Sequence, residues 1–145
     1  MSSISIKIKK LPGAEDLPDP HYAYESDAGL DVFVREEVVL APGERAQVPT
    51  GLAIELPHGY VALVWDKSGI SHKGGIKTLG GVIDAGYRGE CAIGVVNLSK
   101  ETYTFKRGDK VAQILIQKVE HPTIEFVDEL GDAERGDRGF GSSGK

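Results

Sequence analysis

The stretch LAIELPHGYVALVW, residues 52–65, decides the fold class of this chain. Two short apolar runs, 52–56 and 60–65, lie on either side of the turn-forming triplet Pro57-His58-Gly59. Apolar runs of this length, bounded by proline and glycine, are typical of β-strands, because helices need longer periodic segments. The stretch therefore predicts two strands joined by a tight turn.

The same pattern recurs along most of the chain. Further short apolar runs occupy residues 4–8, 30–34, 37–40, 91–96, 103–105 and 111–119. Turn residues separate several of these runs, as at Pro42-Gly43. Helical periodicity is weak, and one short helix is expected from Ser68 to His72. We therefore predict an all-β, single-domain distorted jelly roll or β-barrel of many short strands, with at most one short helix.

Length and charge narrow the class of protein further. The chain has 145 residues, which suits one domain, and its net charge of −5 gives no broad basic surface for nucleic acid. The sequence contains no run of about 18 apolar residues, so no membrane span is predicted. The N-terminus lacks the apolar core of a secretory signal. The single cysteine, Cys91, rules out an internal disulfide. We expect a cytoplasmic protein without nucleic-acid or membrane partners.

The C-terminal residues have a different composition. Residues 128–145 read DELGDAERGDRGFGSSGK and contain few side chains that could join a core. A segment of this kind buries too little apolar surface to offset its ordering entropy. We predict a domain over residues 1–127 and a mobile, glycine-rich arm over residues 128–145.

Several familiar kinds of catalytic site are not supported by the sequence. The four histidines stand far apart and lack zinc-type spacing. No G-x-S-x-G elbow is present, and Cys91 lies inside an apolar run where it is expected to pack. The glycines of the arm do not form the phosphate-binding motif G-x-x-x-x-G-K-[ST].

The segment LGGVIDAGYRGE, residues 79–90, is more informative. It holds four glycines, a single aspartate, Asp84, after two branched apolar residues, and an aromatic residue, Tyr87. Such a hairpin exposes bare backbone that a flat ligand can approach, with one carboxylate and one ring beside it. A tight turn with a solvated aspartate explains the same residues, so the segment alone leaves both interpretations open.

This segment resembles the third sequence motif of the homotrimeric dUTP diphosphatases, or dUTPases. Four other segments resemble the remaining motifs of that family in the family's order: residues 26–31, 66–70, 107–113 and 135–144. The resemblance runs from about Ala23 to Gly144.

The resemblance implies hydrolysis of dUTP to dUMP and pyrophosphate by water attack on the α-phosphorus with Mg²⁺, which limits uracil in DNA and supplies dUMP. Asp84 would be the general base. Tyr87 would pack against deoxyribose where a ribose 2′-hydroxyl would clash. Asp31 resembles the carboxylate that lies near the magnesium ion and acts on it through water.

The remaining binding residues follow from the same resemblance. Base and sugar contacts are implied for Thr78, Gly81, Val82, Ile83, Tyr87 and Phe140. Phosphate contacts are implied for Lys67, Ser68, Gly69, Gln113, Arg135, Gly141, Ser142 and Ser143. The family also implies a homotrimer with shared active sites over which the arm closes.

Four residues depart from the family's motifs. Lys67 stands where the family usually has arginine, which replaces a bidentate fork with a point charge. Thr78 stands for a common asparagine on the uracil side, Arg138 for a glycine and Ser143 for a threonine.

Two other kinds of protein share features with this sequence. A dCTP deaminase shares the fold and a similar third motif, but it carries a catalytic glutamate where this chain has Gly94. A non-catalytic trimeric β-domain is the alternative from a different class, since a fold alone never proves activity. A non-catalytic domain would not need Asp84, Tyr87 and the arm with Phe140 together, so their combination favours an enzyme.

Overall fold

A computed structural model describes residues 3–144, so Met1, Ser2 and Lys145, at the ends of the two predicted segments, lie outside the described residues. The elements of this part of the chain are short strands and one helix. In chain order they are β1 (Lys7–Lys10), β2 (Leu30–Phe33), β3 (Val38–Leu40), β4 (Arg45–Pro49), β5 (Leu52–Glu55), β6 (Tyr60–Trp65), α1 (Ser68–Gly74), β7 (Ile76–Leu79), β8 (Val82–Ile83), β9 (Ala92–Asn97), β10 (Tyr103–Phe105) and β11 (Lys110–Lys118). The all-β prediction with one short helix is confirmed.

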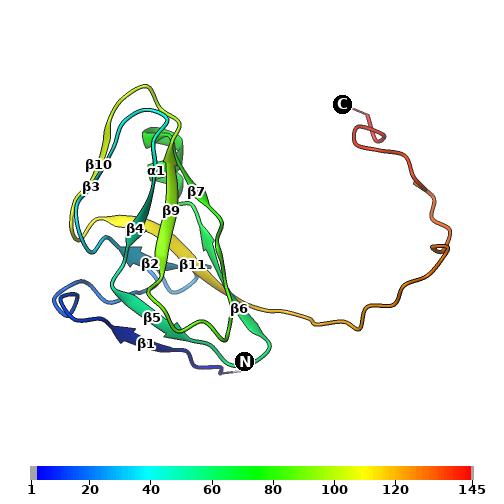
Figure 1. Cartoon of the computed structure of the whole chain (residues 1–145), viewed down its shortest axis with the longest axis horizontal. Helices are drawn as coiled ribbons and strands as arrows, with labels where there is room; N and C mark the ends of the chain where they lie inside the picture. Colours follow the sequence, from blue (N-terminus) through cyan, green and yellow to red (C-terminus); the bar gives the residue numbers. More distant parts are fainter. Residues whose placement is uncertain (1–2, 145) are drawn as a thin grey trace.

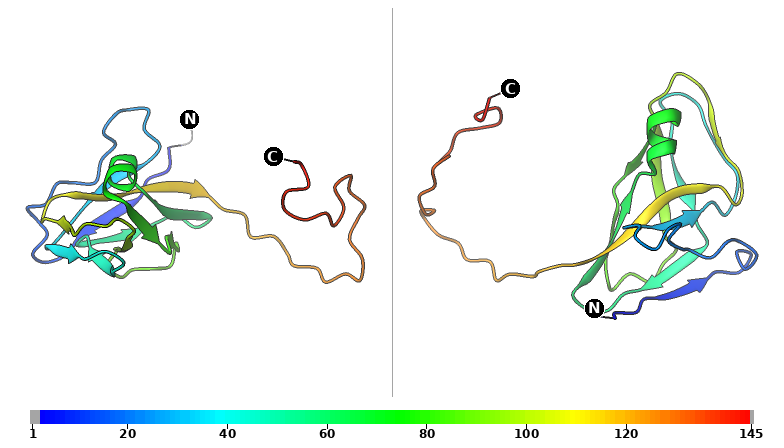
Figure 2. Two further views of the ribbon diagram at one scale, coloured as in Figure 1. Left: turned by 90° about the horizontal axis from the view of Figure 1, so that it is seen from above. Right: turned by 180° about the vertical axis from the view of Figure 1, so that it is seen from behind.

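The strands form four antiparallel sheets. Figure 1 and Figure 2 show how the strands lie in space. The largest has the order β2-β11-β6-β8, and a three-stranded sheet has the order β4-β9-β7. The pairs β1-β5 and β3-β10 complete the set. Within residues 3–144 the sheets do not close into a barrel, so the architecture is the distorted jelly-roll form of the prediction.

One hydrophobic core joins the four sheets. Alternation along the strands sends every second side chain inward, as in β9, where Ile93 and Val95 are buried and the residues before and after each are exposed or half-exposed. The core residues from the different sheets include Val32, Leu40, Val48, Ile54, Ala62, Ile76, Ile93, Val95, Phe105 and Ile114. Because each sheet contributes to the same core, the strand ends that carry polar side chains are held in fixed positions.

Cys91 packs in this core, as predicted. It is 2% exposed, and burial together with the nearby Glu90 charge raises the pKa of its thiol to about 11. A thiol with this pKa stays protonated near neutral pH and is a poor nucleophile.

The apolar-run criterion missed the two-residue strand β8 and two longer strands, β4 and β7. In β4 only Val48 is buried, and in β7 only Ile76. Both strands pair with β9, which lies between them. Their strand structure therefore comes from pairing with a neighbour rather than from their own hydrophobicity.

After β11 the chain leaves the domain as an extended arc, seen in all three ribbon views. Every described residue from Glu120 to Gly144 is exposed, including Phe126 at 95%. In the described part of the chain, no helix has the length and apolar character needed to cross a membrane.

Candidate active site

The glycine-rich hairpin places Asp84 directly after the short strand β8. That strand pairs with β6, and the backbone N–H of Val64 donates to the Gly81 carbonyl at 2.7 Å. Gly81 has a φ of 118°, and a Cβ there would lie 3.0 Å from the Val64 carbonyl oxygen. This close backbone approach requires glycine and fixes the start of the strand that carries the aspartate.

Asp84 and Tyr87 line one open cavity of about 270 Å³. Its other lining residues are Gln47, Val82, Ile83, Glu90, Cys91 and Ala92. The Tyr87 backbone N–H donates to the Asp84 carbonyl at 3.1 Å, so a tight turn holds the two residues together. No ion pair or hydrogen bond engages the exposed Asp84 carboxylate within residues 3–144.

A second cavity, of about 330 Å³, lies along the same hairpin. Thr78, Gly81 and Val82 line it together with Trp65, and Val82 lines both cavities. This cavity therefore brings together three predicted base contacts, whereas Ile83 lines the cavity of Asp84.

Asp66 connects this hairpin to the predicted phosphate side. Its Oδ1 accepts the Thr78 backbone N–H at 2.7 Å, and Lys77 pairs with Oδ2 at 2.5 Å. Burial raises the pKa of the Asp66 carboxyl, but Lys77 and Thr78 outweigh burial and bring it below 3.8. The Asp66 carboxylate thus holds β7 beside the segment that carries Lys67.

An ion cluster around the buried carboxylate of Asp31 lies on the predicted phosphate side. Asp31 is 1% exposed, with Lys67 Nζ 2.6 Å from Oδ1 and Lys110 Nζ 2.9 Å from Oδ2. Burial alone raises the pKa of this carboxyl, but the two lysines outweigh it and lower the pKa below 3.8. The carboxylate fixes two ammonium groups side by side.

Gln113 completes this group. Its Nε2 donates to the Asp66 carbonyl at 2.9 Å, and a Cβ at Gly29 would lie 2.5 Å from its Oε1. Ser68 and Gly69 begin α1 directly after Lys67. The structure therefore groups five predicted residues: Asp31, Lys67, Ser68, Gly69 and Gln113. Sequence reasoning missed Lys110 as a member, although it lies inside the fourth motif.

The arm residues form a third group, separate from the domain in Figure 1. Arg135 donates to the Arg138 and Gly139 carbonyls, and Arg138 donates back to the Arg135 and Glu134 carbonyls. The Phe140 side chain is fully exposed. Gly141, Ser142 and Ser143 are exposed beside it. Among the described residues, the side-chain hydrogen bonds of Arg135 stay within the arm.

Magnesium prefers six oxygen ligands and is often held by substrate phosphates and waters. Among residues 3–144, no three His, Cys, Asp or Glu side chains are grouped so as to hold a metal ion. Asp31, which the resemblance places near magnesium, has a lysine ammonium group on each carboxylate oxygen. This donor set fits a magnesium ion that arrives on substrate phosphates better than an ion held by the protein.

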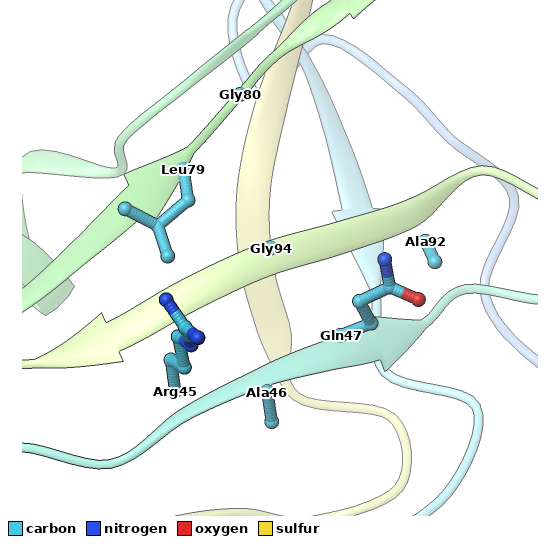
Figure 3. Close-up of a pocket in the computed structure, with 7 residues that line it drawn as sticks. All are labelled: Arg45, Ala46, Gln47, Leu79, Gly80, Ala92 and Gly94. Carbon is cyan, nitrogen blue, oxygen red and sulfur yellow. The ribbon is translucent and has the colours of Figure 1, made fainter.

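A larger open cavity, of about 530 Å³, lies over the sheet β4-β9-β7. Figure 3 shows Leu79 and Arg45 on either side of Gly94, which leaves bare backbone at the centre. A Cβ at Gly94 would lie 3.1 Å from the Leu79 carbonyl oxygen, so the strand pairing leaves little room for a side chain. The position at which a deaminase carries its glutamate thus has no acid or base.

The fold and the site together define an all-β domain suited to a flat ligand that carries several negative charges. The hairpin provides open backbone, one carboxylate and one ring, and the ion cluster provides two cations. The chain belongs to the dUTPase family, whose model matches residues 15–144.

Curated relatives of similar length agree with this assignment. The chain is 46% identical over 145 residues to the deoxyuridine 5′-triphosphate nucleotidohydrolase of Thermobifida fusca, covering 98% of this chain and 80% of that one. It is 45% identical over 146 residues to the enzyme of the same name from Caldanaerobacter subterraneus, covering 98% and 99%.

Solved structures give the same result. A mutant dUTPase of Staphylococcus bacteriophage 80alpha, with dUpNHpp, superimposes with a TM-score of 0.91 at 30% identity, over 99% of this chain and all of that one. A mutant dUTPase of the Staphylococcus aureus phage phi11, described with a structural Mg(II) ion, has a TM-score of 0.81 at 30% identity, over 89% of this chain and all of that one.

Proposed function

We propose that this protein hydrolyses dUTP to dUMP and pyrophosphate by in-line attack of water on the α-phosphorus. The observation that carries the proposal is the cavity in which an unpaired carboxylate, Asp84, and an aromatic ring, Tyr87, meet beside a bare hairpin backbone. The reaction limits uracil in DNA and supplies dUMP. We place it in the cytoplasm, with no nucleic-acid or membrane partner.

Asp84 is the general base of this reaction. Its carboxylate is exposed to the cavity and free of partners within the described chain, so a water molecule can hydrogen-bond to it. A positioned base of this kind contributes about 10²–10⁴-fold to a rate. The rest of the acceleration must come from positioning and from neutralising phosphate charge.

The ion cluster supplies charge for the triphosphate. Asp31 holds Lys67 and Lys110, and a pair of cations attracts phosphate oxygens even after one carboxylate has neutralised part of their charge. Ser68, Gly69 and Gln113 add hydrogen-bonding groups beside Lys67. Magnesium, bound to the substrate phosphates, supplies further charge neutralisation.

The hairpin selects the base and the sugar. Backbone groups of Gly81, Val82 and Ile83 read the uracil edge, with Thr78 beside them. Val82 is 67% exposed and lines both hairpin cavities, so this backbone is open to a flat ligand. Tyr87 occupies the space that a 2′-hydroxyl would need.

The arm, residues 128–145, closes over the bound nucleotide. Arg135 meets the terminal phosphate, Phe140 stacks over the base, and Gly141, Ser142 and Ser143 add phosphate contacts. Such closure excludes water from the site and orders the arm only when substrate is present. Phe140 is fully exposed in the free chain, which fits an aromatic side chain that becomes buried when a ligand binds.

We expect a homotrimer in which subunits share their active sites. Ile124 and Phe126 are 77% and 95% exposed on the segment that leaves the domain, which favours burial against another subunit. Light scattering should give the mass of three chains at assay concentrations. A stable monomer with full activity would contradict the shared site.

The proposed reaction is tested by product analysis. Purified protein with Mg²⁺ should release pyrophosphate and dUMP from dUTP and leave dTTP intact. A deaminase would instead convert dCTP to dUTP with loss of ammonia. A binding module would hold dUpNHpp without releasing pyrophosphate from dUTP, and that outcome would refute the enzymatic proposal.

Replacing Tyr87 with alanine should relax the selection of deoxyribose. We expect the ratio of kcat/KM for dUTP to that for UTP to fall by about tenfold or more, since an added hydroxyl is rejected by shape. Tyr22→Ala is a matched control, because Tyr22 is also 47% exposed and does not line the cavity of Asp84. An unchanged ratio in Tyr87→Ala would leave Tyr87 with a packing role only.

A further inference from the structure

The Tyr87 side chain folds back over the two residues that follow Arg88. Its hydroxyl donates a hydrogen bond to the Glu90 carbonyl at 3.0 Å. A Cβ built at Gly89 would lie 2.6 Å from Tyr87 Cζ and 3.0 Å from Cε2. Carbon atoms do not approach so closely without contact repulsion, so the ring occupies the space that a side chain at position 89 would need.

The backbone of Gly89 does not itself require glycine. Its φ lies outside the left-handed region, unlike that of Gly81 in the same hairpin. The φ at Gly89 therefore does not exclude alanine. The Tyr87 ring is therefore the group that an alanine side chain at this position would meet and displace.

The peptide that holds the Tyr87 hydroxyl is anchored to the domain. Glu90 Oε1 accepts a hydrogen bond from Arg35 Nη1 at 2.8 Å and another from the Gly51 backbone N–H at 2.8 Å. The Glu90 side chain is only 28% exposed, so solvent screens these contacts weakly. Gly89 and the anchored Glu90 peptide thus form a fixed contact surface for the Tyr87 ring, which we call the seat.

We propose that Gly89 is a positioning residue for sugar selection, because its missing side chain lets Tyr87 lie against the anchored Glu90 peptide. The inference rests on the proposed function, in which Tyr87 rejects the 2′-hydroxyl. Tyr87, Glu90 and the base Asp84 line the same cavity, so the seat sets the distance between the ring and the reacting part of the site.

The test compares two glycine-to-alanine substitutions in one hairpin. Gly89→Ala displaces the ring, whereas Gly86→Ala meets no atom within 4 Å and also has an ordinary φ. In Gly89→Ala the ratio of kcat/KM for dUTP to that for UTP should fall about tenfold, with kcat for dUTP reduced less than threefold. Gly86→Ala should keep the wild-type ratio. A wild-type ratio in folded Gly89→Ala overturns the inference.

A double-mutant cycle shows whether Gly89 acts through Tyr87. In a Tyr87→Ala background the ring is gone, so adding Gly89→Ala should leave the ratio of the Tyr87→Ala protein unchanged. A further fall of similar size would mean that Gly89 acts on the site by another route, and it would refute the inference.

A third variant keeps the inference testable if Gly89→Ala fails to fold. Tyr87→Phe retains the ring and Gly89 but loses the hydrogen bond to Glu90, and it should lower the dUTP-to-UTP ratio by about threefold, or roughly 0.65 kcal/mol. An unchanged ratio would show that the seat does not hold the ring. Loss of pyrophosphate release from dUTP in the wild type would instead refute the proposed function.

Discussion

Replacing Asp84 with asparagine is expected to lower kcat for dUTP by about 10²- to 10⁴-fold, with KM nearly unchanged. Asparagine keeps the size of the side chain and one acceptor oxygen, so water can still be held. It cannot accept the proton that the attacking water loses. The substitution should therefore weaken stabilisation of the transition state and leave substrate binding unchanged. Single-turnover kinetics would measure the first effect, and the affinity for dUpNHpp would measure the second.

Asp31 is the rival candidate for the base, and the structure separates the two residues. Both Asp31 oxygens face lysine ammonium groups at 1% exposure, whereas Asp84 is exposed to its cavity. Asp31→Asn should leave Lys67 and Lys110 without their shared counter-charge and lower the thermal unfolding temperature. If Asp84→Asn kept the wild-type kcat while a folded Asp31→Asn lost it, Asp84 would not be the base.

Much of the fold could be predicted from short apolar runs, because those strands carry their own hydrophobic signal. The runs 60–65 and 103–105 coincide with β6 and β10 residue for residue. The first alternating run, 4–8, predicts a strand earlier than β1, which begins at Lys7 and is mostly exposed. The bounds of this mostly exposed strand could therefore be predicted less accurately from alternation than the bounds of a strand with a continuous apolar run.

The parts of the site that the sequence could not predict are contacts between segments far apart in the chain. Lys110 reaches Asp31 from β11, where the register with β2 shifts between Lys110 and Ala112. A bulge of this kind redirects a side chain, and no periodic pattern in the sequence marks it. The Glu90 anchor on Arg35 likewise joins segments far apart in the chain.

Removing the residues after Ala133 should leave the domain folded and reduce dUTP turnover more than any single arm substitution. All described residues beyond this point are exposed, and their hydrogen bonds stay within the arm, so the core loses no contacts. Closure over the nucleotide would be lost, together with Arg135 and Phe140. Thermal unfolding and kcat/KM measured on the same protein would separate the two effects. A truncated protein with the full rate would show that the arm takes no part in the reaction.

Phe140→Ala tests the stacking part of this closure by itself. Base stacking on an aromatic ring contributes about 1–3 kcal/mol, so dUpNHpp affinity should fall by about 5- to 150-fold. Leu130→Ala is the matched control, because Leu130 is an exposed apolar side chain of the same arm, at 88%, without a proposed ligand contact. It should bind dUpNHpp as the wild type does. Equal losses in both variants would point to a general effect of arm hydrophobicity, whereas a loss confined to Phe140→Ala requires a ring that contacts the nucleotide.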